Sequence, residues 1–284
     1  MKATEVSLPY LHSIAVDSQG NLFISEDEQI RRVDSRTGLI FTVAGDGETG
    51  DTREGSPALS VSFRGIEGLA VDDNGNLFVA DTRQNKVFEV NSASGIVSRV
   101  GGNGKAGFSG DGAPAVEASF LYAGSIAVDS LGNILVADSG NCRIRRIDHT
   151  SGKITTVAQT GGPNQNCPPQ PGVIPWQPSP SDPAVDHSGN VYFVKGSKDI
   201  VVRVGPDPET QSIVAGNGKR GFSGDGSAAP AAMLANPSGL AVDSEGNLFI
   251  SEFVNNRIRR VDAKTRKIST VAGNGLPHRI DVGM

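Results

Sequence analysis

The stretch SIAVDSLGNILVADSGNCRIRRIDHTSGKITTVAQ, residues 125–159, decides the fold. It contains four short runs rich in β-branched residues, at 125–128, 133–137, 142–147 and 153–157. Turn residues separate these runs, which is typical of consecutive strands. Asp129 and Gly132 predict a tight turn after the first run, in which the carboxylate accepts backbone N–H groups. The stretch therefore predicts one four-stranded antiparallel sheet.

The tripeptide AVD within this stretch recurs and shows that the whole unit is repeated. Its aspartates are Asp17, Asp72, Asp129, Asp186 and Asp243, separated once by 55 residues and then three times by 57. A period of this size is typical of stacked or closed arrays of small structural units. Because a lone four-stranded sheet leaves both faces in water, the five units must pack on one another. A radial arrangement predicts an all-β β-propeller with five four-stranded blades.

The repeated sequences resemble those of NHL-repeat β-propellers. The resemblance rests on AVDxxGNLFVAD, NxRIRRVD and STVAGNG, which occur together here and cover nearly the whole chain. The longer form GNGxxGFSGDGxPA is similar to the NHL segment of teneurins. The family includes scaffolds, extracellular modules of receptors, RNA binders and a lyase lineage. The resemblance therefore implies a propeller fold without implying one function.

The repeat phase also predicts where the blades lie. We expect them at residues 13–44, 68–101, 125–158, 182–215 and 239–272, within a single domain that spans 1–284. Propellers of the NHL type most often have six blades, whereas this chain has five repeat units. Part of a six-bladed ring is therefore the alternative to a five-bladed one.

The hexapeptide GFSGDG occurs at 107–112 and again at 221–226. Each copy lies in the insert that joins the outermost strand of one blade to the innermost strand of the next. We interpret it as a glycine turn before a short helical stretch, which Asp111 and Asp225 would cap while the phenylalanines anchor the loop on its blade. Calcium binding by the two aspartates is the alternative, although the spaced acidic ligands of a calcium loop are missing.

Other repeated polar residues suggest structural roles. The AVD aspartates resemble a catalytic ring, but their position in the first turn of every blade favours turn capping. Three arginine pairs are expected on third strands, with one side chain of each pair facing outward to solvent or to an acid of a neighbouring blade. These pairs are Arg31 with Arg32, Arg145 with Arg146, and Arg259 with Arg260.

The histidines do not predict a metal centre. His12, His149, His187 and His278 fall at different places in the repeat, so a propeller would not bring three of them together. This weighs against the metal-dependent lyase lineage that the resemblance brings in. No serine, histidine and aspartate share a repeat phase that would join them. The sequence therefore predicts no catalytic residue, no metal and no cofactor.

The loop between the second and third strands varies from blade to blade while the framework stays the same. It is expected at the same face as the inserts, which we call the top face. Recognition residues on a rigid scaffold belong on such loops. The candidate ligand-binding residues are Trp176, Lys195, Lys198, Asp199, Asp138, Asn141, Phe253, Asn255 and Asn256. Trp176 would stack on a sugar or hold a peptide side chain, or instead fill the place of the hexapeptide that the proline-rich fourth insert lacks.

The bulk composition limits the partners. A formal net charge of −5 argues against a dedicated nucleic-acid or anionic-membrane binder. No apolar run approaches the roughly 18 residues of a membrane span. We expect a monomeric, non-enzymatic binding or scaffold module that recognises a protein or carbohydrate partner. The alternatives are a hydrolase or lyase with its site at the top of the central channel and, less favoured, an RNA-binding propeller.

Two cysteines, Cys142 and Cys167, occur once each and have no counterpart in other repeats. Repeat phase places both at the top face, so we expect a disulfide between them. A disulfide implies an oxidising compartment, which means an extracellular or periplasmic protein. Two reduced thiols in a cytoplasmic protein are the alternative.

Overall fold

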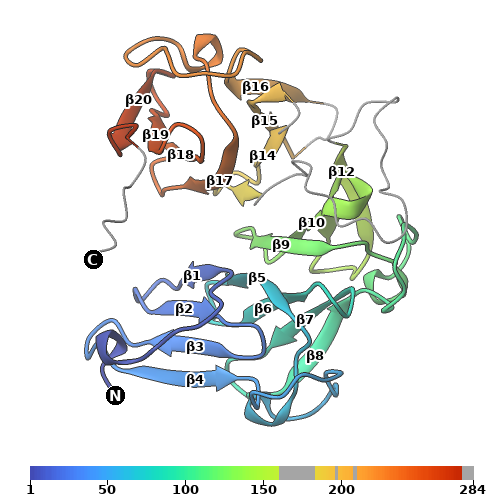
Figure 1. Ribbon diagram of the computed structural model, residues 1–284. Helices are drawn as coiled ribbons and strands as arrows, with labels where there is room; N and C mark the ends of the chain where they lie inside the picture. The colour runs from blue at the N-terminus through green and yellow to red at the C-terminus, as the bar shows by residue number, and fades with distance from the viewer. Residues whose placement is uncertain (160–182, 196–197, 207–209, 277–284) are drawn as a thin grey trace, which may run out of the picture. The chain divides into compact units, whose positions relative to one another are not determined.

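The computed structural model describes residues 1–159, 183–195, 198–206 and 210–276. The chain divides into two compact units, Met1–Pro175 and Trp176–Met284. The described residues form five four-stranded antiparallel sheets, in which consecutive strands are neighbours (Figure 1). Three of these sheets belong to the first unit and two to the second. They are the blades of the predicted β-propeller fold, and we number them 1 to 5 along the chain.

The first unit holds blades 1, 2 and 3. Blade 1 consists of β1 (Ile14–Val16), β2 (Leu22–Ser25), β3 (Ile30–Val33) and β4 (Ile40–Ala44). Blade 2 consists of β5 (Ile66–Val71), β6 (Leu77–Asp81), β7 (Lys86–Val90) and β8 (Val97–Gly101). Blade 3 consists of β9 (Ala123–Val128), β10 (Ile134–Asp138), β11 (Arg143–Ile147) and β12 (Ile154–Gln159).

The second unit holds blades 4 and 5. Blade 4 consists of β13 (Ala184–Val185), β14 (Val191–Lys195), β15 (Ile200–Val204) and β16 (Gln211–Ala215). Blade 5 consists of β17 (Pro237–Val242), β18 (Leu248–Glu252), β19 (Arg257–Val261) and β20 (Ile268–Ala272). Short 3₁₀ helices precede β1, β5, β9 and β17, at η1 (Ala3–Glu5), η2 (Ala58–Ser60), η3 (Ala115–Glu117) and η6 (Ala229–Ala231). The predicted blade positions are confirmed to within two residues, whereas the single domain over 1–284 stays a prediction.

The AVD aspartates cap the first turn of every blade, as predicted. In blade 3, Asp129 Oδ1 accepts the backbone N–H groups of Leu131 and Asn133, each at 2.9 Å, and Oδ2 accepts the Asn133 side chain at 2.8 Å. The same three hydrogen bonds recur at the corresponding aspartate of each other blade. A repeated acid with three such bonds is a structural element of the turn.

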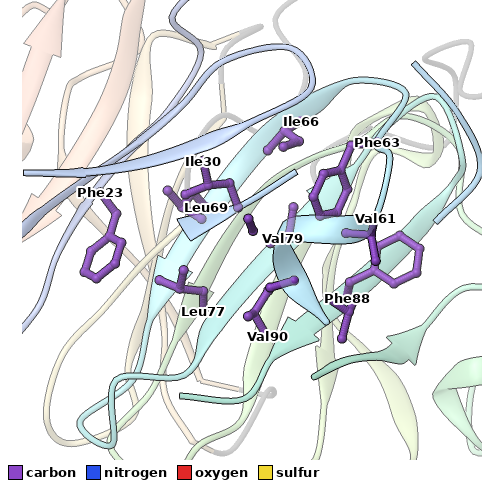
Figure 2. Packing of buried hydrophobic residues seen from close by; sticks show 13 residues of the cluster. Phe23, Ile30, Val61, Phe63, Ile66, Leu69, Leu77, Val79, Phe88 and Val90 are labelled. Carbon is purple, nitrogen blue, oxygen red and sulfur yellow. The ribbon is translucent and has the colours of Figure 1, made fainter. Parts of the chain in front are cut away.

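Apolar side chains fill the spaces between neighbouring blades of one unit. Blades 1 and 2 share a core in which Phe63 and Phe88 meet edge to face, with ring centroids 6.2 Å apart (Figure 2). Blades 2 and 3 share a second core around Phe120, and blades 4 and 5 share a third around Leu234. Phe63, Phe120 and Leu234 come from the inserts before blades 2, 3 and 5, so these three inserts help to seal the contacts between blades.

No helix in the described part of the chain is long and apolar enough to cross a membrane.

Candidate functional site

A fully buried arginine holds the hexapeptide loop of blade 3. Arg145 on β11 has a side chain that is 0% exposed. Its Nη2 donates to Asp111 Oδ1 at 2.8 Å and to the Ser109 carbonyl at 2.7 Å. Its Nη1 donates to the Ser119 carbonyl at 2.9 Å and lies 3.5 Å from Asp138 Oδ2. Two carboxylates and two carbonyls thus compensate the buried charge, which would otherwise be costly.

The hexapeptide phenylalanine packs on this arginine from outside. The Phe108 ring centroid lies 3.9 Å from the Arg143 guanidinium carbon and 4.9 Å from that of Arg145. Contact of this kind is a cation–π interaction. Gly110 has φ +91, and a Cβ there would lie 2.7 Å from the Cα of Ala118. The loop therefore requires glycine at this position in order to close on its blade.

Blade 5 repeats the arrangement. The side chain of Arg259 is 0% exposed and pairs with Asp225 at 2.6 Å and with Glu252 at 3.2 Å. Phe222 lies under the Arg257 guanidinium, with 4.0 Å to its centroid. The two copies of GFSGDG thus make the same contacts, each with its own blade.

These contacts correct two expectations. Asp111 and Asp225 do not cap the helical stretches, because neither η3 nor η6 has a side-chain cap. Asp111 instead binds Arg145 and accepts the Thr156 hydroxyl at 2.7 Å. One arginine of each pair was expected to face outward, and in blades 3 and 5 it is Arg145 and Arg259 that are buried instead. Their acids come from their own repeat and not from a neighbouring blade. The local reading failed because the arginine lies far along the chain from the loop.

Three of the candidate ligand-binding residues lie in this network. Asp138 accepts the Leu121 N–H at 2.8 Å and the Asn141 side chain at 2.8 Å. Burial is the largest influence on the Asp138 carboxyl and raises its pKa to about 6. Asn141 also donates to the Gly107 carbonyl at 2.8 Å, and Asn255 donates to the carbonyl of Gly221 at 2.9 Å. Asp138, Asn141 and Asn255 therefore tie the inserts to the blades, at the edge where second and third strands connect.

The other described candidates gather where blades 4 and 5 meet within the second unit. The backbone of Asn236 joins their loops, because its N–H donates to Asp199 Oδ1 at 2.7 Å and its carbonyl accepts the Phe253 N–H at 3.2 Å. Lys198 is exposed beside Asp199, and Lys195 is half-buried. We call Lys198, Asp199, Asn236, Phe253, Val254 and Asn256 the candidate surface.

Phe253 and Val254 form the apolar tip of this surface. Phe253 is 75% exposed and Val254 is 50% exposed. In blade 2 the position of Phe253 is taken by Thr82, which is buried and donates its hydroxyl to the Ala123 carbonyl at 2.8 Å. Blade 5 therefore presents an aromatic ring to solvent where blade 2 has a hydroxyl that binds the chain itself.

A pocket lies next to Lys198. Its volume is about 410 Å³, and Ile200, Ile213 and Pro230 contribute apolar side chains to its lining. Lys198 and Asn217 contribute polar groups. The sequence missed Val254 and Asn236. Val254 could have been found from the sequence, because it directly follows Phe253 in the same variable loop. The role of Asn236 depends on backbone contacts that no local sequence pattern predicts.

Two predicted residues, Trp176 and Cys167, lie outside the described residues. Cys142 lies in the described part of the chain, where no cysteine is free. Because Cys167 lies outside that part, the pairing of the two cysteines stays a prediction. His278 also lies outside it. Within the described ranges, no group of three His, Cys, Asp or Glu side chains could hold a metal ion.

Comparison with known proteins places these features in a family context. Residues 120–147 match the family model described as NHL repeat. A curated relative, Protein SUPPRESSOR OF QUENCHING 1, chloroplastic, from Arabidopsis thaliana, is 24% identical over 273 residues, which are 88% of this chain and 24% of that protein. The chain thus spans about a quarter of the length of this relative.

Solved structures show the same fold at low identity. A virginiamycin B lyase from Staphylococcus aureus is 16% identical with a TM-score of 0.56, over 93% of this chain and 70% of that chain. A chain of a nidogen/laminin complex is 13% identical with a TM-score of 0.60, over 91% of this chain and 78% of that chain. Identities this low show the fold alone.

Proposed function

This chain belongs to the NHL-repeat β-propellers, and we propose that it is a non-enzymatic binding module that recognises a protein partner through the candidate surface. The observation that supports this proposal is the exposed pair Phe253 and Val254 on a loop whose backbone is tied to Asn236. Large aromatic side chains that become buried on association supply much of the free energy of protein binding.

The fixed backbone of the loop adds to this argument. Binding is weakened by the entropy lost when mobile groups are ordered. The hydrogen bonds of Asn236 to Asp199 and Phe253 hold the two loops before any partner arrives. Only side chains of the candidate surface then need to be ordered, so more of the gain from burying Phe253 contributes to affinity.

The pocket beside Lys198 suggests what the partner presents. Its apolar lining, with Ile213 and Pro230, suits an aliphatic or aromatic side chain. Lys198 at its border suits an acidic group next to that side chain. We therefore propose an acidic and apolar segment of a protein as the ligand, with a glycan as the second choice because of Trp176.

The proposed compartment follows from the predicted disulfide. If Cys142 and Cys167 are paired, the module functions in an extracellular or periplasmic setting, because disulfides persist in oxidising compartments. We propose that it functions there as a monomer. The acidic net charge of −5 disfavours a nucleic-acid partner.

The test is a capture experiment with matched variants. The full chain is used as bait in an extract or secretion of its source, and each captured protein is then purified and titrated by calorimetry. The test variant, Phe253→Thr with Val254→Arg, introduces the residues found at these positions in blade 2. We expect it to weaken binding at least about tenfold, the loss that truncating one aromatic hot spot causes. The control Leu131→Ser removes an equally exposed apolar side chain from a turn of blade 3 and should leave the affinity unchanged.

Other outcomes point to the alternatives. Equal affinity of the double variant and the original chain for every captured protein would exclude the candidate surface. Binding on a glycan array that the double variant retains would favour the carbohydrate alternative. Cleavage of a bond in a small molecule would favour the hydrolase or lyase alternative, for which the fold shared with the virginiamycin B lyase is the support.

A further inference from the structure

A second pocket, with a volume of about 220 Å³, lies between the outer strands of blade 4 and the insert and last turn of blade 5. Its lining includes two arginines, Arg203 on β15 and Arg266 in the turn between β19 and β20. Ser212 adds a hydroxyl, and Pro230 of η6 adds an apolar ring. All four residues lie within the second unit. The pocket therefore presents two cations to a small volume.

Arg203 lacks the acid that accompanies the corresponding arginine of other blades. Arg32 has the same place next to the end of its third strand in blade 1, and its Nη2 lies 3.5 Å from Oδ2 of Asp34, two residues further along. Blade 5 has the same pair at 3.3 Å. In blade 4, Gly205 takes the position of the acid. The half-buried guanidinium of Arg203 has no ion-pair partner among the described residues, which is unfavourable unless an anion binds it.

Arg266 occupies a backbone position that is glycine in three other blades. Its N–H donates to the Asp262 carbonyl at 2.9 Å, and the N–H groups of Gly38, Gly95 and Gly152 each make the same turn hydrogen bond at 2.8 Å. The φ of Arg266 is +58, close to the +64 to +67 of these glycines. A left-handed φ is unfavourable for a residue with a Cβ. The arginine therefore weakens its own turn, which favours a role in binding rather than in folding.

The two guanidinium groups act at one place. Burial, followed by Asp186, raises the pKa of Tyr192 to about 12, whereas the charges of Arg203 and Arg266 both act to lower it. Both cations therefore lie close enough to the phenol to affect its ionisation. Asp186 accepts the phenol at 3.0 Å and caps the first turn of its blade, but within the described part of the chain it forms no ion pair with either arginine. Two like charges that meet in one pocket repel each other unless an anion lies between them.

The lining indicates which anion fits. Guanidinium groups present planar forks of N–H donors that match the oxygens of an oxyanion. Two such charges match a phosphate monoester, which carries about −1.5 to −2 at pH 7. Ile213 is 51% exposed and, with Pro230, lines both this pocket and the pocket beside Lys198. An apolar group attached to the phosphate therefore has a surface to lie on.

We propose that Arg203 and Arg266 bind the phosphate group of a small organic phosphate monoester, whose apolar part lies on Ile213 and Pro230. The Ser212 hydroxyl donates a further hydrogen bond to the phosphate. Neither arginine belongs to the candidate surface or lines the pocket beside it. Variants of the two arginines therefore test this site separately from the proposed function.

The probe for this site is phenyl phosphate, titrated into the full chain at low salt and followed by NMR and calorimetry. We expect saturable binding at one site, with chemical-shift changes at Ser212, Ile213 and Arg266. Arg266→Gly introduces the residue of blades 1 to 3, so it should fold with no loss of stability. It should nevertheless weaken binding at least about tenfold, because charge-assisted hydrogen bonds are lost.

A second variant tests the other arginine. In blade 2 the corresponding residue is Glu89, which faces Phe78 as Arg203 faces Tyr192. Arg203→Glu therefore introduces a residue that this position of the repeat accommodates. It should abolish measurable binding of phenyl phosphate, because it places a negative charge against the phosphate.

The matched control is Lys264→Ala. Lys264 is in the same turn as Arg266 but does not line the pocket, and blade 2 has Ala93 at its position. This variant removes the same charge, so its affinity for phenyl phosphate should stay unchanged. Two other probes test the ligand. Inorganic phosphate lacks the apolar part and phenylacetate has only one negative charge, so each should bind several-fold more weakly than phenyl phosphate.

Several results would overturn the proposal. These are no saturable binding of phenyl phosphate, unchanged affinity in Arg266→Gly, and equal losses in Arg266→Gly and Lys264→Ala. Chemical-shift changes confined to the first unit would also overturn it. If Arg203→Glu does not fold, Arg266→Gly decides alone. An acid of this chain that pairs with Arg203 in solution would give the first of these results.

Discussion

Blades 2 and 3 have the same strand order, but different residues make the contact between the insert and the blade. In blade 3 the cation, Arg145, is on the third strand and the aromatic ring, Phe108, is in the insert. In blade 2 the ring, Phe88, is buried on the third strand, and the cation, Arg99, is on the fourth. Arg99 Nε donates at 2.8 Å to Glu54, which occupies the position of Asp111.

This difference shows that an insert and its strands change together. An acid of the insert pairs with a cation of the blade in both cases, but the cation is on the third strand in blade 3 and on the fourth strand in blade 2. Because a buried arginine without its acid is strongly unfavourable, single substitutions between the two arrangements should be costly, whereas combined ones should be tolerated. Five experiments test this comparison.

The largest effect is expected when the buried cation is removed. Arg145→Leu leaves Asp138 buried without its cation and Asp111 without its partner. We expect the free energy of unfolding to fall by about 3–5 kcal/mol, as measured by urea denaturation. Arg146→Leu, on the same strand but only partly buried, serves as the control and should change it by less than about 1 kcal/mol. Similar losses in both variants would show that the network adds little to stability.

Blade 4 has neither arrangement, so we expect it to depend on a covalent connection. Reduction of the predicted disulfide between Cys142 and Cys167 should lower the free energy of unfolding by roughly 3 kcal/mol, because the closed loop restricts the unfolded chain. Mass spectrometry after alkylation without reductant checks the pairing itself. Two alkylated thiols under these conditions would contradict both the disulfide and the oxidising compartment.

The third test uses pH. Burial raises the pKa of Asp138 to about 6, compared with about 3.9 in an unfolded chain. The folded state therefore holds this proton more tightly, so the stability that the group contributes is full below pH 4 and is lost as the pH rises through 6. Two pKa units correspond to about 3 kcal/mol.

The measurement compares the original chain with Asp138→Asn in urea at pH 4 to 7. The stability advantage of the original chain should decrease by up to about 3 kcal/mol across this range. Burial also raises the pKa of Asp81 in blade 2, which has no arginine at the position of Arg145. Asp81→Asn should therefore give a dependence of the same sign. A difference that does not vary with pH would contradict the assignment to Asp138.

The fourth test exchanges the two arrangements. Arg145→Phe alone introduces the ring of blade 2 and should be destabilising. Adding Phe108→Asp, Asp111→Glu and Thr156→Arg completes the blade 2 set in blade 3. We expect the combination to recover about 2 kcal/mol relative to Arg145→Phe, a coupling energy typical of residues in one network. Additive losses in unfolding experiments would mean that the two arrangements depend on other differences between the blades.

The smallest effect is expected when the phenylalanine of the hexapeptide is replaced. Phe108→Leu removes the contact with Arg143 at 3.9 Å and should lower the free energy of unfolding by about 0.5–1 kcal/mol. Phe222→Leu should give the same loss in blade 5. Phe41 is similarly exposed, and no arginine stacks on it among the described residues, so Phe41→Leu is the matched control. An equal loss in the control would remove the cation–π explanation.

The repeat determined the framework of this protein without further information. Its period located every sheet, because a unit of 57 residues leaves room for four short strands and one insert. The turn at Asp129 was also readable, because the aspartate and the groups that it binds are within four residues of each other. Interactions of this kind are local and depend on the order of residues alone.

Tertiary structure decided what the hexapeptide binds. Asp111 and Arg145 are separated by 34 positions, and nothing in the sequence between them indicates that they meet. Local reasoning assigned Asp111 to a helix cap because a helical stretch follows it. A buried guanidinium without a carboxylate costs more free energy than a 3₁₀ turn without a side-chain cap, so Asp111 binds Arg145 instead.

The candidate surface also depends on tertiary contacts. The sequence singled out Phe253 by the variability of its loop, but its connection to Asp199 runs through the backbone of Asn236. Which side chain is exposed depends on what its neighbours in space already bind. Thr82 is buried and donates its hydroxyl to the Ala123 carbonyl of the next blade, whereas Phe253, in the last blade of the second unit, is 75% exposed.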